Sequence, residues 1–192
     1  MRTNLNNFLI FIQIAVVAIL LSSCQFNTTK SASWQEEFQQ KLPLLGHRNW
    51  VLVVDKAFPL QSARGMTVIN TGEQLPDVLQ YVLGSISTST HVKPIVFTDL
   101  EFAQITEDLS PGVDGLKKSI SASLKNHQIN TLLHNDVFAK LDSASNLFEV
   151  LVLKTESTIP YSSVFIQLDC GYWNAEKEQK LRSKMVEKLN YK

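Results

Sequence analysis

The sequence predicts an α/β domain of three layers (α/β/α), in which helices cover both faces of a central, mostly parallel or mixed sheet. Short apolar runs rich in β-branched residues alternate with amphipathic segments along the chain, a pattern typical of strands joined by crossover helices. Two runs, residues 50–55 (WVLVVD) and 93–97 (KPIVF), are apolar over most of their length. Such strands are buried on both faces of a sheet. The fold class follows from this alternation and these two strands.

The individual elements can be placed from spacing, capping and turn residues. Apolar side chains recur at helical intervals over residues 34–45, and Gly46 stands where a C-cap glycine belongs, so a helix is expected there. Pro94 has no backbone N–H, so it is expected at the start of the strand 93–97. The other expected elements are, in chain order, a strand near 67–70, a helix near 74–83, a helix from the turn at 110–112 to about 125, a strand near 129–133, a helix near 135–143, and strands at 148–153 and 164–168.

A charged segment, residues 175–189, is expected to form an additional helix after the last strand. Leu181, Met185 and Leu189 stand four residues apart and make a narrow apolar stripe along it. A stripe of this kind is more typical of docking against the domain than of a site for a partner. Residues 34–192 therefore form one expected domain, of a length that can bury a substantial core.

The first residues have the features of an export signal. A short, positively charged start precedes the apolar run 8–21, which is about 14 residues long, whereas a bilayer-spanning helix needs roughly 20. The run ends in LSSC at Cys24, which has the form of the bacterial lipobox. We therefore expect residues 1–23 to be a lipoprotein signal peptide and Cys24 to carry the lipid. An ordinary signal peptide with an incidental cysteine is the alternative.

The expected lipid at Cys24 indicates a location on a membrane. Acyl chains contribute roughly 0.8 kcal/mol per buried CH₂, so a multi-chain anchor at Cys24 would keep the domain on a membrane. Residues 24–33 are polar and have no hydrophobic periodicity, as in a flexible tether. Gln25, rather than aspartate, follows the cysteine, which favours the outer membrane over the inner one. The predicted location is the cell envelope.

Composition and motifs exclude several functions. The chain has 18 Lys and Arg and 18 Asp and Glu, and they form no basic stripe, so nucleic acid is not an expected partner. Glycine-rich phosphate loops, the nucleophile elbow and metalloprotease motifs are absent from the sequence. The four histidines are scattered without metal-ligand spacing. Neither a metal nor a cofactor is therefore expected.

One constellation remains, around the first buried strand. His47 stands at the entrance to the strand 50–55 and Asp55 at its exit, with Phe58 and Pro59 in the following loop. In open α/β sheets, ligands bind beyond the carboxyl ends of strands, which points to Asp55. Spacing alone leaves the alternative of a surface histidine and a carboxylate that caps a loop.

These residues carry a family resemblance. The motif LGHxN, which contains His47, and the strand end VVDKAFP, which contains Asp55, resemble the opening of the ribose pyranase and fucose mutarotase (RbsD/FucU) family. The resemblance covers about residues 40–171. Its later landmarks are Val68-Ile69-Asn70, Asp77-Val78-Leu79, Leu133-His134-Asn135 near Phe138, Lys154-Thr155-Glu156 and Pro160-Tyr161-Ser162-Ser163.

The resemblance implies an RbsD-like fold, a ring of subunits, and cofactor-free interconversion of the cyclic forms of a free monosaccharide. Opening a hemiacetal needs a base at the anomeric hydroxyl and an acid at the ring oxygen, and one histidine can serve in both directions. By the family motifs, that residue is His47, Asp55 orients its imidazole or binds a sugar hydroxyl, and Tyr161 donates to a sugar oxygen. His134 matches a second histidine, although its spacing to Phe138 is one residue longer than usual.

Three positions depart from the family pattern. Ser163 stands where asparagine is usual and offers a sugar fewer hydrogen-bonding groups. Asn49 replaces an acid, and Lys56 replaces a small residue, where it could pair with Asp55 or fill part of the pocket. We count His134, Ser163 and Lys56 as candidates for sugar binding. The leading hypothesis is a lipid-anchored, homo-oligomeric sugar mutarotase; the alternatives are a sugar-binding lipoprotein without activity and a structural ring with a vestigial pocket.

Overall fold

The computed structural model describes residues 32–190, so the expected signal peptide 1–23, Cys24 and most of the tether 24–33 lie outside the described residues. The elements are, in chain order, α2 (Trp34–Lys41), the 3-10 turn η1 (Leu42–Leu44), β1 (Trp50–Val54), β2 (Met66–Asn70), α3 (Leu75–Thr88), β3 (Val92–Asp99), the 3-10 turn η2 (Glu101–Gln104), α4 (Val113–Leu124), β4 (Ile129–Leu132), α5 (His134–Ser145), β5 (Val150–Lys154), β6 (Val164–Cys170) and α6 (Ala175–Asn190). Every expected helix and strand is present, with ends shifted by a few residues.

Six strands form one mixed sheet in the order β2-β5-β1-β6-β3-β4. Strand β6 runs antiparallel to both of its neighbours, β1 and β3, and every other pairing is parallel. Five strands therefore end at the same edge of the sheet, where β6 begins. We call this edge the carboxyl edge and the opposite one the amino edge.

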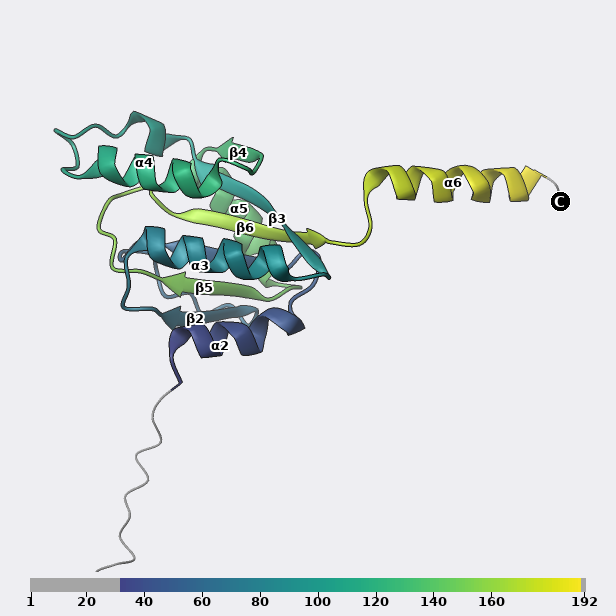
Figure 1. Ribbon diagram of the computed structural model, residues 1–192, viewed down its shortest axis with the longest axis horizontal. Coiled ribbons are helices and arrows are strands. Elements are labelled where there is room, and N and C mark those ends of the chain that lie inside the picture. The colour runs from purple at the N-terminus through teal and green to yellow at the C-terminus, as the bar shows by residue number, and fades with distance from the viewer. Residues whose placement is uncertain (1–31, 191–192) are drawn as a thin grey trace, which may run out of the picture. The chain divides into compact units, whose positions relative to one another are not determined.

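Helices cover both faces of the sheet (Figure 1). Val51 and Val53 of β1 belong to a core that also contains residues of α2, α3 and α4. Trp50, Leu52 and Val54 belong to a second core, which they share with residues of α5. All five side chains are at most 3% exposed. The strand is thus buried on both faces, as its apolar sequence predicts, and the predicted three-layer α/β/α architecture is confirmed.

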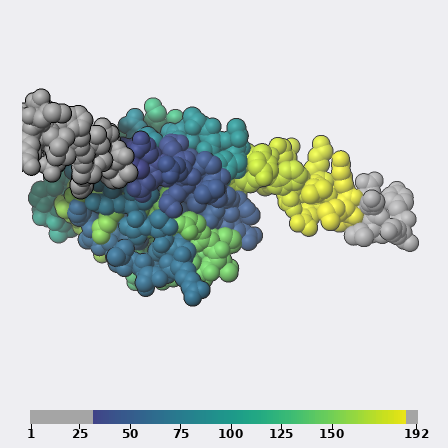
Figure 2. Space-filling view, turned by 90° about the horizontal axis from the view of Figure 1, so that it is seen from below, coloured from purple at the N-terminus to yellow at the C-terminus, as the bar shows by residue number. Residues whose placement is uncertain are grey.

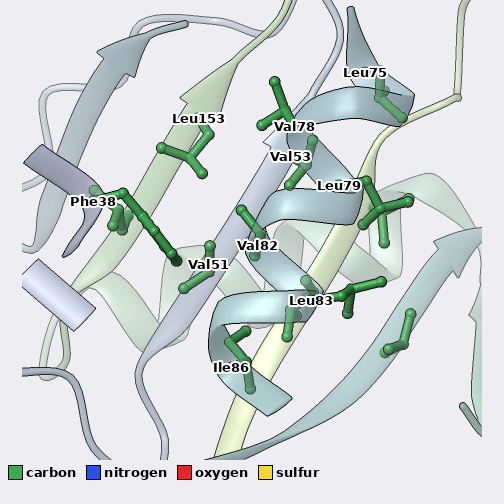
Figure 3. Packing of buried hydrophobic residues seen from close by; sticks show 14 of the residues in the cluster. Phe38, Val51, Val53, Leu75, Val78, Leu79, Val82, Leu83, Ile86 and Leu153 are labelled. Carbon is green, nitrogen blue, oxygen red and sulfur yellow. The ribbon is translucent and has the colours of Figure 1, made fainter. Parts of the chain in front are cut away.

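Among the helices, α3 contributes the most residues to the larger core (Figure 3). Its buried residues stand three or four positions apart, so they share the face that packs on the strands. Burying a side chain of this size contributes roughly 1.5–3 kcal/mol. Pro76 lies in the first turn, where its missing N–H would have no helical acceptor. The buried residues are Leu75, Val78, Leu79, Val82, Leu83 and Ile86.

Two proline positions differ from the predictions. Helix α2 stops at Lys41 and continues only as η1, because Pro43 lacks the N–H needed to extend the α-helical hydrogen bonds. Leu42, rather than Gly46, is the C-cap of α2. Pro94 is the third residue of β3, at a point where β4 does not yet pair with β3. A strand tolerates proline where one side is unpaired.

Helix α6 forms over the expected residues, but Leu181 and Met185 of its apolar stripe are not packed on the domain. Leu181 and Met185 are 43% and 46% exposed, and in Figure 2 the α6 side chains, in yellow, lie open to solvent. The prediction that this stripe docks against the domain is therefore wrong. Among residues 32–190, no helix combines the length and apolar character needed to cross a membrane.

Candidate functional site

The carboxyl edge of the sheet holds a cavity of about 310 Å³. This volume lies at the lower end of the range for small-molecule sites, roughly 300–1,000 Å³. Three segments far apart in the sequence form its walls: the loop after β1, the start of α5, and the loop before β6. All three meet here because β1 and β4 end, and β6 begins, at this edge. The lining residues are Asp55, Ala57, Phe58, Pro59, His134, Phe138, Thr158, Pro160 and Tyr161.

Asp55 is held by hydrogen bonds to both of its carboxylate oxygens. Ser163 donates its hydroxyl to Oδ2 at 2.9 Å, and the Ala57 backbone N–H donates to Oδ1 at 2.9 Å. Ser163 Oγ in turn accepts from the Asp55 backbone N–H at 3.2 Å. Because each carboxylate oxygen can accept two hydrogen bonds, Asp55 retains capacity for a ligand hydroxyl.

His134 is the first residue of α5, and its side chain is 36% exposed at the cavity wall. Its Nδ1 lies 2.8 Å from Oδ2 of Asp99. The Glu101 carboxylate accepts from the His134 backbone N–H, at 3.0 and 3.2 Å from its two oxygens. Glu101 thereby supplies the acceptor that the N-cap residue, Leu133, cannot offer to the start of the helix. The backbone and the ring of His134 are each fixed by a separate carboxylate.

Asp99, the last residue of β3, is a buried acid. Its side chain has no solvent exposure. Burial raises the pKa of the Asp99 carboxyl to about 6, while the hydrogen bond and the charge of His134 act in the opposite direction. The neighbouring carboxylates of Glu101 and Asp55 raise this pKa further. At pH 7 the carboxyl is therefore mostly ionised, although it is buried.

Aromatic rings surround the imidazole. Tyr161 meets His134 edge-on, with ring centroids 5.1 Å apart and an interplanar angle of 86°. Phe138 lies one helical turn after His134, and the centroids of their rings are 4.7 Å apart. The Phe138 ring also packs against Phe58. Tyr161 has a φ of 57°, in the left-handed region that is uncommon for residues with a side chain. Strain of this kind costs about 1–3 kcal/mol and clusters at functional sites.

A solved structure shares this arrangement of strands and helices. RbsD from Bacillus subtilis, in complex with D-ribose, matches with a TM-score of 0.51 at 15% sequence identity, over 69% of this chain and 91% of RbsD. The chain has an RbsD-like fold. The fold that the resemblance implies is thereby confirmed.

A second RbsD-like match is the fucose mutarotase from Streptococcus pneumoniae in complex with L-fucose. It has a TM-score of 0.49 at 16% identity, over 73% of this chain and 97% of the mutarotase. No protein-family model and no curated protein sequence matches the chain.

The RbsD-like fold places His47 at the amino edge, away from Asp55. His47 precedes β1 and lines an open cavity of about 570 Å³, together with residues that include Cys170 and Trp173. Strand β1 has five residues and is roughly 16 Å long. Within one chain, His47 and Asp55 therefore face different sites.

The predicted sugar-binding residues Ser163 and Lys56 do not line the cavity at the carboxyl edge. Ser163 is 3% exposed and supports Asp55 from behind. The Lys56 ammonium forms an ion pair with Glu156 instead, so Lys56 neither pairs with Asp55 nor fills the cavity. Within residues 32–190, no group of three or more His, Cys, Asp or Glu side chains is placed to hold a metal ion.

Asp99 escapes prediction from the sequence. The expected strand ends at residue 97, whereas β3 continues to Asp99. An acid at the end of an apolar strand, as with Asp55 after β1, is the pattern that could have found it. Its partner His134 is 35 residues further along the chain. Their contact depends on β4 pairing with β3, which no local pattern reveals.

Proposed function

We propose that this protein is a sugar mutarotase, which interconverts the cyclic forms of a free monosaccharide by opening and closing the hemiacetal ring without a cofactor. The observation that carries the proposal is the His134 imidazole at the cavity wall, bound through Nδ1 to a buried carboxylate. The RbsD-like fold supports a monosaccharide as substrate, because RbsD was solved with D-ribose bound.

Ring opening is a balanced pair of proton transfers. A base takes the proton of the anomeric hydroxyl, the C1=O bond forms as the bond from C1 to the ring oxygen breaks, and an acid protonates the released oxygen. Closure reverses these steps on either face of the carbonyl. An imidazole can act in both directions near neutral pH. Among the described residues, Nε2 of His134 has no hydrogen-bond partner, so His134 acts as the base and the Tyr161 hydroxyl donates to the ring oxygen.

The rest of the cavity holds the sugar. The remaining lone pairs of the Asp55 carboxylate accept from a sugar hydroxyl. Phe58, Phe138 and Tyr161 present apolar surface to the C–H groups of the ring. A few convergent polar groups in a largely apolar lining is the usual composition of small-molecule sites.

The family role of His47 requires a second copy of the chain. Because His47 lies at the amino edge, it reaches a sugar beside Asp55 only from a neighbouring subunit. The protein is accordingly proposed to form a homo-oligomer, in which the amino edge of one copy approaches the carboxyl edge of the next. Head-to-tail contacts of this kind close into a ring when the rotation between subunits permits.

Saturation-transfer NMR on free sugars tests the activity. D-Ribose comes first, because it is the sugar bound to RbsD, followed by fucose, galactose and glucose. Irradiating one ring form should reduce the signal of the other more strongly with the protein present than without it. If the folded protein, verified by circular dichroism, accelerates exchange for none of these sugars, the proposal fails.

A sugar-binding protein without activity is the second candidate. Ser163 favours it, because this residue stands where the family has asparagine and its hydroxyl is committed to Asp55. Calorimetry distinguishes the two functions: heat of sugar binding without faster exchange of ring forms supports the binding protein. Heat of binding with faster exchange supports the mutarotase.

The location is proposed from the sequence alone. The LSSC motif at the end of the apolar run supports lipidation of Cys24 and anchoring to a membrane of the cell envelope, the outer membrane rather than the inner one. Labelling a bacterial expression host with radioactive palmitate should mark the wild-type protein. The Cys24→Ser variant should lose the label and leave the membrane fraction, and retention of both would contradict the anchor.

A further inference from the structure

We propose that Asp99 is a positioning residue, which holds His134 in the tautomer with its proton on Nδ1 so that the lone pair of Nε2 faces the cavity. The catalytic consequence of this inference rests on the proposed function, whereas the tautomer itself does not. Asp99 is not part of the cavity wall at the carboxyl edge. It acts through His134, which is.

The surroundings of the Asp99 carboxylate single it out. The side chain is fully buried, and a buried carboxylate needs hydrogen bonds to replace its lost hydration. Oδ2 has the His134 ring as its partner, whereas Oδ1 has no partner among the described residues. Asp55, by comparison, receives donors on both oxygens. The buried Asp99 carboxylate is thus compensated by a single hydrogen bond, which comes from an imidazole.

The ionisation of Asp99 decides where the ring proton lies. An ionised carboxylate only accepts hydrogen bonds, so Nδ1 must be the donor, and in the neutral imidazole Nε2 then carries the lone pair. A protonated Asp99 could donate to Nδ1 and leave the ring proton on Nε2. The groups that face Asp99 are His134 from α5, which favours the ionised form, and Glu101 from η2 and Asp55 after β1, which oppose it. The ionised carboxylate of Asp99 therefore holds the ring in the Nδ1–H tautomer.

Neighbouring contacts keep the ring in one orientation. Glu101 fixes the backbone N–H of His134, while Phe138 and Tyr161 flank the imidazole. Turning the ring over would break the hydrogen bond to Asp99 and leave that carboxylate without a partner in the described structure. The cost of leaving a buried charge unpaired opposes the turn. Nε2 therefore stays directed at the cavity.

The ring ¹⁵N chemical shifts of His134 test the tautomer directly. Long-range ¹H–¹⁵N spectra of the purified full-length protein at pH 7.5 should show a protonated Nδ1 and an unprotonated Nε2 for this residue. The resonances are assigned by their loss in His134→Ala. A wild-type spectrum with the proton on Nε2 overturns the inference, whether or not the protein proves to accelerate sugar exchange.

Two substitutions at Asp99 and one control complete the test. Asp99→Asn introduces an amide N–H that can donate to Nδ1 and should move the ring proton to Nε2, whereas Asp99→Leu removes the acceptor and should lose the preference for the Nδ1–H tautomer. Asp136→Asn changes an exposed acid in the first turn of the same helix and should leave the ring as in wild type. If Asp99→Leu does not fold, the wild-type and Asp99→Asn spectra still decide the question. A folded Asp99→Leu variant with the wild-type tautomer contradicts the inference.

Sugar exchange gives the second readout. Asp99→Leu should slow exchange at least tenfold, because a wrongly protonated Nε2 cannot accept the anomeric proton. Asp99→Asn should slow exchange as well, because its amide N–H favours the tautomer with the proton on Nε2. Equal rates for wild type and a folded Asp99→Leu variant, measured on a sugar that wild type interconverts, overturn the catalytic consequence. Absence of exchange in wild type refutes the proposed function and leaves the spectra to decide on the tautomer.

Discussion

The two edges of the sheet differ in the chemistry that they gather. At the carboxyl edge, three distant segments bring Asp55, His134 and Tyr161 around one cavity, with a buried acid behind the imidazole. At the amino edge, His47 lines a larger cavity, of about 570 Å³, beside Cys170 at the end of β6. Strand direction, rather than distance along the sequence, therefore decides which polar residues share a site. Only seven residues lie between His47 and Asp55 in the sequence, yet β1 carries them to opposite edges.

The two carboxylates at the carboxyl edge, Asp55 and Asp99, also differ in their burial and hydrogen bonding. Asp55 lies in the cavity wall, and backbone and side-chain donors satisfy both of its oxygens. Asp99 lies beneath the surface with one oxygen unpartnered among the described residues, and burial raises its pKa. The first environment suits a group that meets a ligand. The second suits a group that acts on a neighbouring side chain at a cost in stability.

Histidine substitutions at the two edges should have the largest effects. We expect His134→Ala to slow sugar exchange about 10²–10⁴-fold, the usual contribution of a general acid/base group. His47→Ala should slow it as well, because in the proposed homo-oligomer the neighbouring copy supplies His47 to the site. NMR exchange rates on a sugar that wild type interconverts provide the measurement.

Mixing the two histidine variants tests whether His134 and His47 of one site come from different copies of the chain. After subunit exchange, random assembly places an intact His134 beside an intact His47 at about one in four head-to-tail interfaces. The mixture should therefore recover about a quarter of the wild-type activity. A mixture that stays inactive, with subunit exchange demonstrated by mass spectrometry, would show that both histidines must come from the same chain.

Asp99 should make stability depend on pH in the direction opposite to most acids. Its pKa in the folded protein, about 6, lies above its ordinary value of 3.8, so the folded state favours the protonated form. The stabilisation is present below pH 3.8 and is lost as pH rises through 6, which amounts to about 3 kcal/mol. Urea unfolding from pH 4 to 8 should show wild type losing this much relative to Asp99→Asn. Parallel stability curves for the two proteins would contradict the burial of a charged Asp99.

Tyrosine substitutions at the two edges should have smaller effects on exchange than the histidine substitutions. Tyr161→Phe keeps the ring that packs on His134 but removes the hydroxyl, so exchange should slow about tenfold to a hundredfold, as for the loss of one donor to a developing charge. Tyr172→Phe makes the same change at the amino edge, where that side chain is 68% exposed. It should leave the rate within about twofold of wild type. Equal losses for both variants would mean that the hydroxyl of Tyr161 has no special role.

Local patterns predicted the fold better than the site. The alternation of buried strands and amphipathic helices gave the three layers, because burial on both faces of a strand leaves a continuous apolar run. The rule for carboxyl ends points to Asp55, and Asp55 lines the cavity at that edge. The pairing of Asp99 with His134 could not be predicted, since it depends on the strand order β3-β4. Nor does any local pattern reveal that β1 separates His47 from Asp55.

Lysine substitutions should give the smallest effects and test whether Lys56 takes part in the site. Its ion pair with Glu156 is largely solvated, with side chains 46% and 35% exposed, so Lys56→Ala should change the free energy of unfolding by less than about 1 kcal/mol. Exchange should stay within about twofold of wild type.

Lys154→Met is the matched comparison for Lys56→Ala, because the Lys154 ammonium donates to the Phe58 carbonyl at 2.8 Å and fixes the loop that lines the cavity. Removing this donor should cost about 1–2 kcal/mol of stability and slow exchange more than Lys56→Ala does, because the loop carrying Phe58 is released. Urea unfolding and NMR exchange measure both quantities on each variant. If instead Lys56→Ala slows exchange more than Lys154→Met does, Lys56 leaves Glu156 to contact the sugar. That result would also place part of the sugar specificity of this protein at the start of the loop after β1.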